Sequence, residues 1–173
     1  MKNFKNFLII SLFAMALVLP QDTNAYETTE QTALRINDNT VLYTITYKFG
    51  FLNRETYMPI GVVRGLENSS SSSYVGYDIL NQDQVYKEGK VNALVLSSTK
   101  IKDNQYYLPE GKAGYFTLVA LVTVPNESLV KEEDLSLKIN HLPFTMVKTE
   151  SGKKTKVYLS SEELEDYVSP RIK

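Results

Sequence analysis

The chain has 173 residues, with 19 basic and 20 acidic side chains and a net charge of −1 at pH 7. No stretch has the density of Lys and Arg that a nucleic-acid interface needs, so we exclude nucleic-acid binding. Cysteine is absent and histidine occurs once, which leaves no ligand set for a structural zinc site. The sequence therefore predicts no metal and no cofactor.

The first residues have the three parts of a secretory signal peptide. Lys2 and Lys5 precede an apolar run over residues 7–19, FLIISLFAMALVL, and the expected cleavage falls between Ala25 and Tyr26. The alternative is a retained membrane anchor, but the run is shorter than the roughly 20 residues that a spanning helix needs. No Cys follows the run, which excludes a lipid anchor. We expect a signal peptide over residues 1–25.

The predicted mature chain, residues 26–173, has the size of one domain. Its net charge is −2, and no later segment is long and apolar enough to remain as a membrane span. A chain of this size can bury enough surface to be stable without disulfides. Exported domains of eukaryotes often depend on disulfides, so their absence favours a bacterial protein, either secreted or periplasmic.

The first elements of the mature chain are predicted from polarity and alternation. Residues 26–32 are polar and indicate a loose lead-in, and residues 33–36 are a candidate short strand before the turn residues 37–39. A strand with one buried face is predicted next, because apolar side chains alternate with polar ones from Val41 to Phe49. The residues on its buried face are Val41, Tyr43, Ile45, Tyr47 and Phe49.

Further strands are predicted along the rest of the chain, separated by turn residues and by a serine-rich surface loop over residues 67–73. They cover residues 57–63, 74–80, 91–97, 106–108, 115–124, 135–139, 144–147 and 156–159. The strand over residues 115–124 is apolar on both faces, so we expect it to be covered on both sides. Residues 149–153 have the composition of a hairpin loop.

One helix is expected, over residues 161–168. Ser160 and Glu163 have the spacing of a capping box, and Leu164 and Tyr167 would share one helix face. Pro170 would end the helix. The whole pattern predicts an all-β fold: a single antiparallel two-sheet sandwich over residues 26–173, immunoglobulin-like in architecture, with one short C-terminal helix.

Catalytic chemistry has little support in the sequence. His141 is interpreted as a residue between two strands that bonds to a loop, and a general base or pH sensor is the alternative. No serine lies in a nucleophile-elbow motif. The acidic clusters at residues 132–134 and 162–166 are interpreted as a solvated loop and a helix N-terminus, with calcium binding as the minor alternative. We therefore predict no catalytic residues.

The chain has twelve tyrosines and no tryptophan. Tyrosine is amphipathic and rigid, so it is common where a surface meets a protein or a sugar. Ordinary packing in a sheet is the alternative interpretation, and it holds for Tyr43 and Tyr47. The candidate binding residues are Tyr74, Tyr77, Tyr86, Tyr106 and Tyr107.

The leading functional hypothesis is an exported, non-catalytic binding module that contacts a protein or an envelope polymer. A structural or assembly component of an envelope complex, pairing through strand edges, is the alternative. A hydrolase with two catalytic carboxylates is a third hypothesis. The ligand, the strand order and the oligomeric state stay open at this level.

Overall fold

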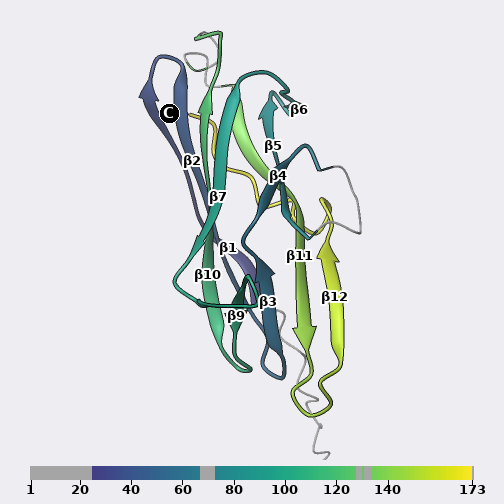
Figure 1. Cartoon of the computed structure of the whole chain (residues 1–173). Helices are drawn as coiled ribbons and strands as arrows, with labels where there is room; N and C mark the ends of the chain where they lie inside the picture. Colours follow the sequence, from purple (N-terminus) through teal and green to yellow (C-terminus); the bar gives the residue numbers. More distant parts are fainter. Residues whose placement is uncertain (1–24, 67–72, 128–129, 131–133, 173) are drawn as a thin grey trace, which may run out of the picture.

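The computed structural model describes residues 25–66, 73–127, 130 and 134–172. In this part of the chain, two sheets pack face to face (Figure 1). The smaller one has four strands in the order β1-β2-β10-β7, and we call it the small sheet. Its strands are β1 (Ala25–Asn37), β2 (Thr40–Gly50), β7 (Lys90–Ser97) and β10 (Ala113–Thr123).

The second sheet has eight strands, and we call it the large sheet. Its main path is β4-β5-β11-β3-β9-β8, with β12 beside β11 and β6 beside β5. All its strand pairs are antiparallel except β4 and β5, which are parallel. Its strands are β3 (Glu55–Pro59), β4 (Val62–Arg64), β5 (Val75–Asn81), β6 (Gln84–Val85), β8 (Lys100–Lys102), β9 (Gln105–Leu108), β11 (Leu135–Val147) and β12 (Lys154–Leu159). The predicted all-β fold with two sheets is confirmed.

The alternating segment forms β2 as predicted. Val41, Tyr43, Ile45, Tyr47 and Phe49 are each fully buried, whereas the polar residues between them are half-buried on the outer face. The predicted loose lead-in before this strand is wrong, because β1 runs without interruption from Ala25 to Asn37. Its polar side chains are compatible with a strand because β2 supplies the backbone hydrogen bonds and the outer face of the small sheet is wet.

The segment around His141 is one long strand and not two. β11 pairs with β5 in its first half and with β12 and β3 in its second half. A register shift between Ile139 and His141 marks a β-bulge, which lets the strand bend between its two sets of partners. His141 therefore lies inside a strand and is 3% exposed.

The expected C-terminal helix is absent, and residues 161–166 form turns. The capping-box contact exists, since the Ser160 amide donates to the Glu163 carboxylate (2.9 Å), and one helical turn follows, from the Leu164 amide to the Ser160 carbonyl (3.1 Å). The turn stops there because Tyr167 already bonds to β11: its carbonyl accepts from the Ile139 amide (2.9 Å). Too few residues separate β12 from this contact for a longer helix.

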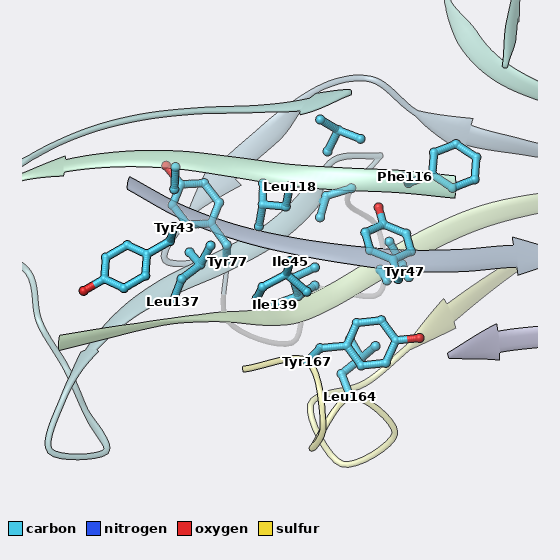
Figure 2. Close-up of a cluster of buried hydrophobic side chains, with 14 of the residues drawn as sticks. Tyr43, Ile45, Tyr47, Tyr77, Phe116, Leu118, Leu137, Ile139, Leu164 and Tyr167 are labelled. Carbon is cyan, nitrogen blue, oxygen red and sulfur yellow. The ribbon is translucent and has the colours of Figure 1, made fainter. Parts of the chain in front are cut away.

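One hydrophobic core fills the space between the two sheets (Figure 2). The small sheet contributes side chains from β2 and β10, the large sheet contributes them from β5 and β11, and the C-terminal turns add Leu164 and Tyr167. The labelled members in Figure 2 are Tyr43, Ile45, Tyr47, Tyr77, Phe116, Leu118, Leu137, Ile139, Leu164 and Tyr167. Within the described ranges, no helix is long and apolar enough to cross a bilayer.

β10 is central in the small sheet, between β2 and β7. Phe116, Leu118, Ala120 and Val122 are fully buried on its inner face. The expectation that its other face is also covered is wrong for this chain: Leu121 is 36% exposed and Tyr115 is 55% exposed. The large sheet covers only the inner face, so the outer face of β10 lies at the surface.

Candidate binding site

Two of the five candidate tyrosines belong to the core. Tyr77 on β5 is 4% exposed and Tyr106 on β9 is 6% exposed. The Tyr106 hydroxyl donates to the Val95 carbonyl (2.8 Å), and its ring packs edge-on against Phe116. Both residues occupy inward positions of their strands, where successive side chains alternate between the two faces. They are therefore removed from the candidate binding face.

Tyr86 follows β6 and is half-buried. Its amide donates to the Ile79 carbonyl (2.8 Å), and its own carbonyl accepts from the Arg64 guanidinium. Burial is the main cause that raises the pKa of the Tyr86 hydroxyl. These contacts tie the loop after β6 to β4 and β5, so we assign Tyr86 a structural role.

Tyr107 lies on the outer face of the large sheet, beside Tyr57 of β3 (ring centroids 5.2 Å apart). The Tyr107 hydroxyl donates to Glu55 (2.7 Å), and the Lys102 ammonium donates to the Tyr57 hydroxyl (3.0 Å). The Lys102 nitrogen also lies over both rings, 4.8 Å from the centroid of Tyr107 and 5.6 Å from that of Tyr57. We call these four residues the tyrosine–lysine cluster.

The polar groups of the tyrosine–lysine cluster form hydrogen bonds with one another. The hydrogen bond to Glu55 is the main cause that raises the pKa of Tyr107, and the hydrogen bond with Tyr57 is the main cause that raises the pKa of Lys102. Because Lys102 already occupies the ring faces, the cluster does not offer an open aromatic platform. Its role is to fix β3, β8 and β9 beside one another.

Tyr74 lies differently, at the edge of a groove of about 400 Å³. It is 51% exposed, and its ring lies against Gly61, where a Cβ would come within 2.4 Å of the ring. The lining also includes Tyr158 of β12, which stacks on His141 (centroids 5.5 Å apart, planes at 22°). The groove thus runs over the outer face of the large sheet, between the segment before β5 and strand β12.

The groove lining mixes apolar and polar groups. Prolines and tyrosines provide flat apolar surfaces, while amide, hydroxyl and ammonium groups can form hydrogen bonds. The lining residues are Pro59, Ile60, Gly61, Ser73, Tyr74, Asn104, Gln105, Pro143, Phe144, Thr145, Lys156 and Tyr158. The lining contains no carboxylate, and Lys156 is its one formal charge at neutral pH. Such a surface can hold a ligand through apolar contacts and hydrogen bonds.

The structure brings one candidate tyrosine, Tyr74, into this groove together with residues that the sequence analysis did not select. Tyr158 is the main one. The alternation of residues 154–159 was a usable signal, because inward Val157 and Leu159 place Tyr158 on the outer face. Pro59 and Pro143 were not predictable as neighbours, since the strands that carry them are not adjacent to each other in the sequence.

The other candidates for chemistry are separated from this groove. A second shallow depression, of about 360 Å³, is lined by Asp38 and Glu127, and both side chains are exposed. A catalytic pair of carboxylates works in a cleft that excludes water, which this depression does not. Among the described residues, no group of three His, Cys, Asp or Glu side chains is placed to hold a metal ion. Glu132 and Glu133 lie outside the described residues.

Comparison with known proteins adds little to this geometry. No protein-family model matches the sequence, and no curated protein matches it. Among solved structures, the chain is similar to the yeast GGA1 GAE domain (GGA1_GAE domain-P21), with 13% identity over 82% of this chain and 95% of that chain and a TM-score of 0.29. A likeness at this level assigns neither a family nor a ligand to this chain.

Proposed function

We propose that the chain is an exported, non-catalytic binding module of a bacterial cell envelope, and that the groove beside Tyr74 holds a short stretch of a polysaccharide. The observation that carries this proposal is the groove itself, with Tyr74 and Tyr158 on its walls and no carboxylate in its lining. Export is supported by the signal-peptide pattern of residues 1–25.

The mixed lining is the reason for a sugar ligand. A sugar ring presents apolar C–H groups that pack against tyrosine and proline, and hydroxyl groups that bond to amides such as those of Asn104 and Gln105. Lys156 would add an attraction for acidic groups on the polymer. The volume of about 400 Å³ lies near the lower end of the range for ligand pockets, which suits a short part of a long chain.

The test uses the protein that a bacterial host expresses from the full-length sequence and exports. After cleavage of the signal peptide, the first residue of this protein should be Tyr26. Glycan arrays and isothermal titration with the retained glycan should give micromolar binding. Tyr74→Ala should weaken it about tenfold, since one ring contact contributes about 1 kcal/mol beyond its buried area. The matched control is Leu52→Ala, which removes a large side chain of similar exposure (56% against 51%) from a turn outside the groove.

Two results would contradict the proposal. Equal weakening by Tyr74→Ala and Leu52→Ala would show that the groove is not the site. The second result is binding of an envelope protein to this chain while no glycan binds at concentrations up to the millimolar range. In that case the ligand of the groove would be a protein and not a polysaccharide.

A further inference from the structure

The outer face of the small sheet carries a contiguous group of aliphatic side chains, which we call the aliphatic face. Four of them are 36–57% exposed, and the other two are half-buried. They are Leu34 of β1, Leu42 of β2, Val119 and Leu121 of β10, and Leu94 and Leu96 of β7. All four strands of the sheet therefore contribute.

Strand register makes these residues neighbours. Leu34, Leu42 and Leu121 lie directly opposite one another across three strands. Val119 lies opposite Leu94 in the next outward row. Leu96 follows in the row after that, opposite Thr117. The aliphatic face is thus a diagonal stripe from β1 to β7, and it contains the outward apolar residues of β10 that sequence periodicity predicts to be covered.

The outward side chains beside the stripe are uncharged, and the charged outward side chains lie at the edges of the small sheet. Thr32, Thr44, Thr46, Thr117 and Asn92 are uncharged. The charged residues are Glu30 at the β1 edge, Lys90 at the opposite corner on β7, and the ion pair of Lys48 with Glu27 (3.5 Å) at one end. Exposed apolar patches that are rimmed by polar residues often mark sites of association.

We propose that the aliphatic face binds a second copy of this chain in a symmetric, face-to-face dimer. Its size fits a weak dimer. Strands about 4.8 Å apart and outward residues about 6.8 Å apart give a face of about 500 Å² over residues 115–123 and their neighbours. Two copies then bury about 1,000 Å², which is near the lower limit for a specific interface.

Charge complementarity selects a second copy as the occupant. From the same spacings between strands and between outward residues, Glu30 and Lys90 lie about 12 Å from the long axis of the stripe, on opposite sides of it. A two-fold rotation about the long axis of the stripe places the stripe on itself and brings Glu30 of each copy close to Lys90 of the other. The two sheets then cross at about 90°, which is one of the two common packings of sheets. Every charge at these corners meets its opposite.

This dimer does not depend on the proposed ligand, but it would affect how the ligand binds. The groove and the aliphatic face are on the outer faces of different sheets. Two copies joined through their small sheets therefore carry two outward grooves. On a repetitive polymer, two sites would bind with higher avidity than one.

The first part of the test is sedimentation velocity of the exported chain from about 1 to 500 µM. A monomer–dimer equilibrium with a dissociation constant on the order of tens of micromolar is expected. Leu94→Glu should raise that constant at least about 100-fold, because it places a charge in the centre of each half of the interface. Leu52→Glu is the matched control, since Leu52 is 56% exposed in a turn outside the face.

The second part is a charge exchange that only a second copy can satisfy. Glu30→Lys and Lys90→Glu should each raise the dissociation constant about threefold, and the double variant should restore it. A strict monomer over the whole concentration range, a dimer insensitive to Leu94→Glu, or equal effects of Leu94→Glu and Leu52→Glu would overturn the proposal. Failure of the double variant to restore the dimer would overturn the stated geometry.

Discussion

Tyr43 and Tyr47 allow a matched test of how the core is held together. Both lie on the inner face of β2, both are fully buried, and a change to Phe removes the same hydroxyl group from each. The Tyr43 hydroxyl donates to the Leu135 carbonyl on the other sheet (3.0 Å). The Tyr47 hydroxyl has no hydrogen-bond partner within the described part of the chain. The two substitutions should therefore have opposite effects on stability.

The magnitudes follow from the hydrogen bonds. Tyr43→Phe removes a buried bond and should lower the free energy of unfolding by about 1 kcal/mol. Tyr47→Phe removes a buried polar group without a partner and should raise it by about 1 kcal/mol. The packing of Tyr47 on Phe116 and Tyr167, with centroids 5.7 and 5.8 Å away, is kept by Phe. The difference between the variants is thus about 2 kcal/mol.

Urea unfolding of the purified protein at pH 7, followed by circular dichroism, measures this difference. For a chain of this size, a slope of about 2 kcal/mol per M separates the two midpoints by about 1 M, with the unmodified protein between them. If Tyr47→Phe lowers stability as much as Tyr43→Phe does, the Tyr47 hydroxyl is satisfied and the reasoning is refuted.

Two further predictions concern the same core. Leu164 lies in the turns that replace the expected helix and is fully buried, so Leu164→Ala should lower the free energy of unfolding by about 3 kcal/mol. Glu165 is exposed, so the control Glu165→Ala should change it by less than about 0.5 kcal/mol. Equal effects of the two variants in urea unfolding would contradict the turn structure. Burial raises the pKa of Tyr43, Tyr47 and Tyr167 above the ordinary value of 10.0, so the unfolded chain loses these protons first. The stability present below pH 10 should therefore fall as the pH rises above 10, by up to about 1.4 kcal/mol per pH unit for a fully buried tyrosine, and equal stabilities at pH 9 and 11 would rule this out.

Local alternation in the sequence was sufficient for the fold class. The period of two in β2 predicted both the strand and its buried face, because side chains of a strand alternate whatever its partners are. It was not sufficient for β1, whose polar residues form a strand only because β2 lies beside them. The sequence could not exclude the C-terminal helix either, because Ser160 and Glu163 form the same contact in a single turn as in a helix.

The candidate site shows the same division. Tyrosine content alone pointed to five residues, and the structure places Tyr77 and Tyr106 in the core and Tyr74 in the groove. Residue type could not separate them, because an amphipathic ring is stable in either place when its hydroxyl finds a partner or water. Alternation could place Tyr158 on the outer face of its strand, but only the pairing of β12 with β11 brought it beside Pro143 in the groove.

The sequence by itself determined that this chain has a cysteine-free, two-sheet β core, because short-range periodicity decides which residues of a strand share a face. Only the tertiary structure decided which of those faces are covered, because coverage depends on strands that are distant along the chain. β10 is the clearest case: it carries apolar residues on both faces, and the large sheet covers one of these faces and leaves the other at the surface.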